Sequence, residues 1–222
     1  MVVKPCQLIL FLEEPRFSRP GSGLAGRLTP SRAEAYFDAM SGDLLGLATA
    51  WCRRGPGRSV RVNLAPGPET AEIQRTIKRL GFECVVDAER SEIEHLKLYT
   101  NEVRTESCPV IFLRPRAPDL PVELLEKMMT SPSHVTFLPT TDGGWHALHA
   151  CLPQTGLFEE VAFETAKEAR DTAERIEERG LSIESVRPWP VVQTLSDLEA
   201  LWHRLRKDPA RAPRCHSLLE AW

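Results

Sequence analysis

The chain has 222 residues, of which 42% are apolar and 27% charged, so it can bury a substantial core and fits one large domain. Its 28 basic and 31 acidic residues are mixed along the sequence and give a formal net charge of -3, which argues against a nucleic-acid partner. No run approaches the roughly 18 to 20 apolar residues that span a bilayer, and no secretory signal is recognisable, so we expect a cytoplasmic protein.

The first half of the sequence alternates between strand and helix patterns. Residues 7–12 (QLILFL) form a short apolar run that is typical of a strand buried on both faces of a parallel sheet. The loop 13–28 is rich in proline, glycine and arginine, which favours a binding loop. Ser31 and Glu34 have the spacing of a capping box for a helix that ends near Arg53. The patterns that follow predict a strand at 59–64, a helix at 68–80, a strand at 83–86 and a helix at 91–103.

The second half begins with a central strand, predicted at 110–113, and a loop at 114–120. A helix from about Pro121 to Met129 follows, since proline suits the first turn of a helix. Asp-Gly in the segment 140–144 indicates a turn between two strands. These two strands are predicted at 135–138 and 145–151, and after them come a helix at 163–179, a strand at 181–186 and a helix at 195–206 with Thr194 as its cap.

This order of elements predicts an α/β fold with a mostly parallel central sheet and a small antiparallel element. Ligands of such open sheets bind beyond the carboxyl ends of the strands, so we expect the site in the segments 13–28, 114–120, 139–145 and 187–194. Residues 1–206 are expected to form a single domain. Residues 207–222 are expected to form a C-terminal tail, whose apolar end packs either on its own domain or on another chain.

Cysteine and histidine residues give no strong metal signal. The six cysteines occur singly, without a C-x-x-C pair, and we interpret them as reduced and mostly structural. His146, His149 and Cys151 resemble a metal cluster, but histidines three residues apart in a strand point to opposite faces. Cys215-His216 would need partners from elsewhere to hold zinc. We therefore predict no metal site from these residues.

Four motifs fall in the four segments where we expect the site: Pro20-Gly21 with Ala25-Gly-Arg-Leu28, Arg114-Pro-Arg-Ala-Pro-Asp-Leu-Pro121, Thr141-Asp-Gly-Gly-Trp-His146 and Trp189-Pro-Val-Val-Gln-Thr194. In their order they resemble the motifs of a bacterial family of GT-A-like glycosyltransferases associated with radical-SAM and selenoprotein-type domains, which are related to MobA-like nucleotidyltransferases. APDLP and DGGW are the most specific matches. The resemblance covers nearly the whole chain and implies a three-layer GT-A-like fold, that of the nucleotide-diphospho-sugar transferases.

The resemblance also implies roles for individual residues. In that family the first loop binds the phosphates of a nucleotide or nucleotide-sugar, and carboxylates hold Mg²⁺ or Mn²⁺, which neutralises the charge on a leaving diphosphate. The implied site consists of Asp119 and Asp142 as catalytic residues, Gly21, Gly23, Arg27, Arg114 and Arg116 as phosphate-binding residues, and Gly143, Gly144 and Trp145 as substrate-binding residues.

Several of these residues also have a purely structural interpretation. Asp119 precedes a helix and can cap it, and Asp142 suits a turn whatever its chemistry. Trp145 is either a stacking surface or a core residue. Arg27 either binds phosphate or is a solvated loop charge.

The chain departs from the family pattern at the motif positions where the family has residues that bind phosphate or hold a cation. The loop lysine and threonine of the family correspond to Ala25 and Gly26, and its first middle-motif aspartate corresponds to Arg116. Val191 and Gln193 stand where the late motif has aspartates.

Three functions are consistent with these departures. The first is a non-catalytic binding or scaffolding protein, with a protein partner or a second copy bound through the tail. The second is a transferase that holds a metal ion with Asp119 and Asp142. The third is a metal-independent transferase that binds the diphosphate with arginines.

Overall fold

In the described part of the chain, the strands form one sheet in the order β3-β2-β1-β4-β6-β5-β7. The computed structural model describes residues 5–12, 24, 26–65, 70–87, 90–102, 108–151, 156–163 and 165–222. Strand β6 runs antiparallel to both of its neighbours, and the other pairs are parallel. The strands are β1 (Cys6–Leu12), β2 (Arg58–Leu64), β3 (Glu83–Val86), β4 (Val110–Leu113), β5 (Val135–Pro139), β6 (Trp145–Ala150) and β7 (Ile183–Ser185).

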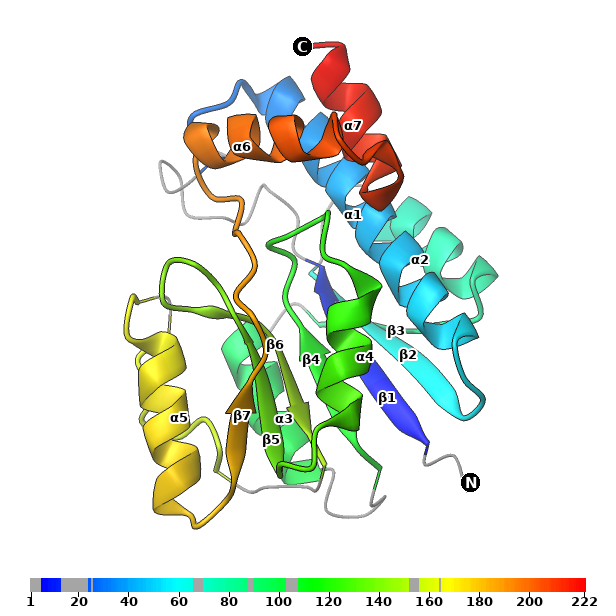
Figure 1. Cartoon of the computed structure of the whole chain (residues 1–222). Coiled ribbons are helices and arrows are strands. Elements are labelled where there is room, and N and C mark those ends of the chain that lie inside the picture. The colour runs from blue at the N-terminus through cyan, green and yellow to red at the C-terminus, as the bar shows by residue number, and fades with distance from the viewer. Residues whose placement is uncertain are drawn as a thin grey trace.

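Helices cover both faces of the sheet, which gives three layers (Figure 1). The helical elements are α1 (Pro30–Arg53), α2 (Thr70–Arg79), α3 (Glu92–Glu102), α4 (Val122–Thr130), α5 (Glu168–Glu178), α6 (Leu195–Leu205), the 3-10 helix η3 (Pro209–Arg211) and α7 (Pro213–Glu220). Residues of α1, α2, α4, α6 and α7 share one core cluster, and residues of α3 and α5 belong to a second cluster on the opposite face. The predicted α/β fold with a mostly parallel sheet is thus confirmed. No helix among the described residues is long and apolar enough to cross a membrane.

Strand β1 shows why the sheet is buried on both sides. Leu8, Leu10 and Leu12 point into the cluster with α1, whereas Ile9 and Phe11 point into the cluster with α3. A strand whose two faces are both apolar needs helices on both sides, and this pattern was readable in the sequence.

Helix starts differ from prediction in two places. Thr29, not Ser31, caps α1: its side chain accepts a hydrogen bond from the Arg32 N–H, and Pro30 occupies the first turn. The predicted capping box at Ser31–Glu34 is therefore wrong. The predicted helix at 163–179 begins only at Glu168, and Phe163 lies before it, packed against the second core cluster. Thr194 does cap α6, in a capping box with Asp197.

Residues 207–222 pack on their own domain. Cys215 and Leu219 of α7 are buried in the core cluster that contains α1. The Asp43 carboxylate in α1 accepts hydrogen bonds from the N–H groups of Arg214, at 3.0 Å, and Cys215, at 2.8 Å. An acidic side chain of the first long helix therefore caps the last helix of the fold.

Candidate active site

Three of the four predicted segments meet beyond the carboxyl end of β4, and we call 114–120, 139–145 and 187–194 together the strand-end edge. Thr140 and Trp189 form a parallel β-bridge. The Val192 N–H donates to the Arg116 carbonyl at 2.9 Å, and the Arg114 N–H donates to the His146 carbonyl at 2.8 Å. Main-chain hydrogen bonds thus join segments that are far apart in the sequence.

The fourth segment, 13–28, is only partly described. Gly21, Gly23 and Ala25 lie outside the described residues. Arg27 is described and is solvent-exposed, and its N–H donates to the Leu24 carbonyl. The predicted phosphate role of this loop therefore stays a prediction.

Arg116 provides a cation at the strand-end edge that forms no ion pair within the described residues. Its side chain is half-buried, and within the described residues its guanidinium makes no hydrogen bond or ion pair. Gly144 lies beside it: a Cβ at Gly144 would lie 3.7 Å from Arg116 Nη1 and 3.2 Å from Thr140 Oγ1. Asp142 Oδ1 also lies 3.7 Å from that Cβ position, so three polar side chains surround position 144.

Asp142 and Gly143 shape the turn beside Arg116. The Asp142 carboxylate is exposed and accepts hydrogen bonds from the Thr140 hydroxyl and, at 3.4 Å, from the Gly144 N–H. Gly143 has a φ of +96°, and any Cβ there would clash with the Ala166 carbonyl. These contacts match the turn interpretation of Asp142.

Asp119 is held by two side chains from later in the chain. Its side chain is 1% exposed. Arg204 of α6 donates from Nε to Oδ2 at 2.7 Å and from Nη2 to Oδ1 at 3.2 Å. The indole N–H of Trp189 donates to Oδ1 at 3.3 Å. Both carboxylate oxygens are therefore occupied by a bidentate arginine and an indole.

The helix-cap interpretation of Asp119 is wrong. Pro121 is the N-cap residue of α4, and that cap has no side-chain hydrogen bond. Asp119 instead joins the 114–120 loop to α6 through Arg204. The residues next to Asp119 in the sequence give no sign of this contact.

Arg114 is buried and belongs to a network of charged side chains. Its guanidinium donates to Glu92 of α3 and to Glu168 of α5, and it lies 5.0 Å from the Trp145 ring centroid. Trp145 is fully buried and stacks on Phe158, with 6.0 Å between ring centroids. The geometry matches the core interpretation of Trp145, and two carboxylates already neutralise Arg114.

His146 lies behind Arg116 and is fully buried. Its Nε2–H donates to the Trp189 carbonyl at 3.0 Å, which leaves Nδ1 as an acceptor that has no partner among the described residues. Burial lowers the pKa of His146 to about 4, and the nearby charge of Arg116 acts in the same direction. Burial also lowers the pKa of His149 to about 4. Both imidazoles are neutral at pH 7.

A carboxylate-held divalent cation does not fit the described residues of this edge. Asp119 has no free oxygen, Arg116 is itself a cation, and Val191 is a buried apolar side chain where the resemblance places a carboxylate. In the described part of the chain no three His, Cys, Asp or Glu side chains are arranged to hold a metal ion. Magnesium and manganese bind carboxylate oxygens, so the donor set at this edge is unsuitable.

Comparisons with known proteins support the fold. No family model matches the chain, and no curated protein is detectably similar to it. A solved structure from Desulfovibrio desulfuricans G20, a predicted nucleotide-diphospho-sugar transferase, is similar with a TM-score of 0.80 at 16% identity over 99% of this chain and 95% of that one.

Two further solved structures are similar at lower TM-scores. The 4-diphosphocytidyl-2C-methyl-D-erythritol synthase of Anaerococcus prevotii DSM 20548 gives a TM-score of 0.57 at 10% identity, over 91% of this chain and 99% of that one. A CMP:2-keto-3-deoxy-manno-octonic acid synthetase in complex with CTP gives a TM-score of 0.53 at 13% identity, over 92% of this chain and 99% of that one. The chain therefore has the fold of the nucleotide-diphospho-sugar transferases, as the motifs predicted.

Proposed function

We propose that this protein binds a nucleotide or nucleotide-sugar at the strand-end edge through arginine, and that it is a binding or scaffolding protein without metal-assisted transfer. One observation carries the proposal: both oxygens of the Asp119 carboxylate are held by Arg204 and Trp189, while the guanidinium of Arg116 has no ion-pair partner among the described residues. The proposal takes the ligand class from the similar solved structures, one of which contains CTP.

Electrostatics favours an anion over a metal ion next to Arg116. Two unit charges 4 Å apart interact by about 4 kcal/mol at an effective dielectric constant of 20, which is attractive for a phosphate and repulsive for a divalent cation. The guanidinium fork also matches two phosphate oxygens. Asp142, with one oxygen already engaged by Thr140, is then a turn residue near the ligand and not a metal ligand.

Isothermal titration calorimetry with CDP, UDP, GDP and UDP-glucose, in EDTA and in excess Mg²⁺, tests the proposal. We expect one of these ligands to bind in EDTA, with little change on adding Mg²⁺. Arg116→Ala should weaken that binding about tenfold or more, which corresponds to about 1.4 kcal/mol. Arg170→Ala is the matched control, because Arg170 is an exposed arginine on α5.

Two results would contradict this function. Binding that requires Mg²⁺ and is lost in Asp119→Asn would favour the metal-dependent transferase. If Arg116→Ala and the parent protein had equal affinity for the nucleotide, Arg116 would not be part of the binding site.

The unpaired guanidinium of Arg116 also supports a second function, metal-independent transfer, because a fixed cation stabilises the charge that develops on a leaving diphosphate. Release of UDP from UDP-glucose in EDTA, slower in Arg116→Ala than in Arg170→Ala, would favour this alternative. An absence of release together with nucleotide binding would favour the non-catalytic function.

A further inference from the structure

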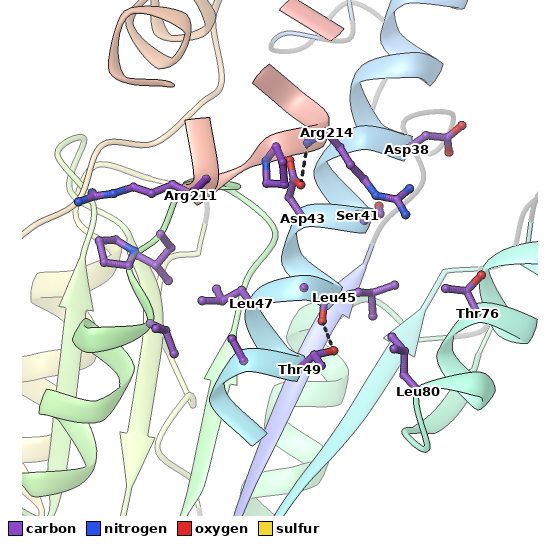
Figure 2. A pocket seen from close by; sticks show the side chains of 18 of the residues that line it. Asp38, Ser41, Asp43, Leu45, Leu47, Thr49, Thr76, Leu80, Arg211 and Arg214 are labelled. Atoms are coloured by element: carbon purple, nitrogen blue, oxygen red, sulfur yellow. Dashed lines mark hydrogen bonds between the residues drawn. The ribbon is translucent and has the colours of Figure 1, made fainter. Parts of the chain in front are cut away.

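A cavity of about 1000 Å³ lies over α1; Leu120 of the strand-end edge lines it, but Arg116 and Asp142 do not. We call it the outer cavity. Helix α1 forms its floor, residues of α2 form one wall, and the start of α4 together with η3 and α7 forms the other wall (Figure 2). Its volume is in the range of small-molecule sites.

Two glycines keep the floor of the outer cavity open. Gly42 and Gly46 lie inside α1, where glycine costs about 0.5 to 1 kcal/mol relative to alanine. A Cβ at Gly42 would overlap the side chain of Arg214, so this glycine makes room for that arginine. A Cβ at Gly46 would meet nothing within 4 Å of it in the described structure. Internal packing therefore accounts for Gly42 but not for Gly46.

One end of the cavity carries hydrogen-bond donors without acceptors. Ser41 is 9% exposed, and its hydroxyl makes no hydrogen bond within the described residues. The guanidinium of Arg214 likewise has no ion pair there. Figure 2 shows Arg214 extending from α7 across α1 beside Ser41. Asp43 fixes this arrangement, because it holds the main-chain N–H groups of Arg214 and Cys215.

The other end of the cavity has apolar side chains, with Thr49, Arg53 and Thr76 at its margin. Leu45 of α1 and Ile73 of α2 line it together with Leu80, which follows α2. Leu80 is 38% exposed, so a ligand that covers it removes apolar surface from water. The outer cavity thus has Arg214 and Ser41 on one side of Gly46, and on the other side a group of apolar side chains beside Arg53.

We propose that the outer cavity binds a small anionic amphiphile, with its carboxylate or phosphate head on Arg214 and Ser41 and its apolar chain over Gly46 toward Leu45 and Leu80. The Ser41 hydroxyl has no partner among the described residues and lies beside a guanidinium, and a compact oxyanion accepts from both.

Two acidic side chains of the cavity oppose the anionic head. Asp38 lies at the same end as Ser41, and Glu72 lines the α2 wall. Asp43 is hydrogen-bonded to α7, Glu123 is paired with Arg54, and Asp208 is paired with Arg211. Asp38 also interacts with another group of the chain, and removing its charge should tighten binding of an anion at this end.

Calorimetric titration of the full chain with dodecanoate and dodecyl phosphate, below their micelle concentrations, tests the inference. Inorganic phosphate and a neutral dodecyl glycoside are the ligand controls. We expect both anionic amphiphiles to bind, each control ligand to bind at least about tenfold more weakly, and Arg214→Ala to lose about tenfold or more. Ser41→Ala should lose less, and Asp38→Asn should gain affinity.

Gly46→Leu is the sharpest variant. Leucine fills the floor of the outer cavity and is a better helix former by about 0.8 kcal/mol, so binding should be lost while the thermal midpoint stays equal or rises. Arg116→Ala should bind the amphiphiles like the parent protein, which separates this site from the proposed nucleotide site. Unchanged binding in Arg214→Ala or Gly46→Leu, equal binding of the neutral glycoside, or no binding of either anion would overturn the inference.

Discussion

At the residue scale, two aspartates of the strand-end edge differ in how far away their partners are in the sequence. Asp142 bonds Thr140 and Gly144, each two residues away, so its turn role could be anticipated from the Asp-Gly-Gly sequence. Asp119 bonds Trp189 and Arg204, which follow it by 70 and 85 residues. No local pattern connects residues so far apart: Trp189 lies in the predicted segment 187–194, but neither its contact with Asp119 nor Arg204 was predicted.

Asp119→Ala tests the structural role of this carboxylate. The change leaves the Arg204 guanidinium without its partner and the Trp189 indole N–H without its acceptor. Breaking a buried charged hydrogen-bond network costs about 2 to 4 kcal/mol, so we expect a loss of that order in the free energy of unfolding. Urea denaturation followed by tryptophan fluorescence measures it.

The control for Asp119→Ala is Glu199→Gln, an exposed carboxylate on the same helix α6, which should change stability by less than about 0.5 kcal/mol. If Asp119→Ala were as stable as this control, Asp119 would not be a structural anchor and would again be a candidate metal ligand.

At the element scale, α1 and α7 depend on each other. The last helix supplies Cys215 and Leu219 to the core cluster of α1, and α1 supplies Asp43 to the unpaired N–H groups at the start of α7. Burial raises the pKa of Asp43, because desolvation outweighs the two backbone hydrogen bonds. The tail expected from its Arg- and Pro-containing sequence is in fact two short helical elements.

Asp43→Ala should loosen α7 selectively. Two main-chain N–H groups lose their acceptor, which costs about 1 to 3 kcal/mol where they stay buried. We expect hydrogen exchange in residues 213–220 to be faster than in the parent protein, with β1 and β4 less affected, as measured by mass spectrometry. Asp43→Asn retains one acceptor oxygen and should give an intermediate rate. Equal protection of 213–220 in all three proteins would show that apolar packing alone holds α7.

At the scale of the whole molecule, strand bounds were predicted better than helix ends. The predicted bounds at 110–113 match β4, whose four residues are all buried, and those at 83–86 match β3, although this edge strand has no buried residue. The start of α1 was missed because Thr29 and Ser31 are both good capping residues, and Pro30 decides between them.

The sequence located the strand-end edge but not its ion pairs. Arg114 and Arg116 lie two residues apart and were predicted alike, although only Arg114 meets two carboxylates, from α3 and α5. Which arginine remains unpaired depends on tertiary contacts with Glu92 and Glu168. The proposal that Arg116 and not Arg114 binds the ligand therefore needed the structure.

Buried histidines should make the fold sensitive to acid. The pKa values of His146 and His149 are about 4 in the folded protein, against about 6.5 in an unfolded chain, so unfolding takes up protons in this range. The stability they contribute is present above about pH 6.5 and is lost as the pH falls through about 4, on the order of 3 kcal/mol for each histidine. Urea denaturation at about pH 7 and about pH 5 measures the loss.

His149→Gln should reduce this pH dependence, because glutamine does not titrate. His203→Gln, at an exposed histidine, should leave it unchanged. Asp43 acts in the opposite direction, since its raised pKa favours the folded state on acidification. A parent protein with the same stability at both pH values would show that the buried imidazoles are not the acid-sensitive groups.

The capping of α7 by Asp43 also has a consequence for biosynthesis. Helix α1 precedes α7 by some 160 residues, so the apolar face that Cys215 and Leu219 cover stays open while the intervening strands and helices emerge from the ribosome. The sheet can assemble during translation, but the surface of α1 is completed only when residues 213–220 have been made. Nascent chains that stop before α7 should therefore associate with chaperones that recognise exposed apolar helices.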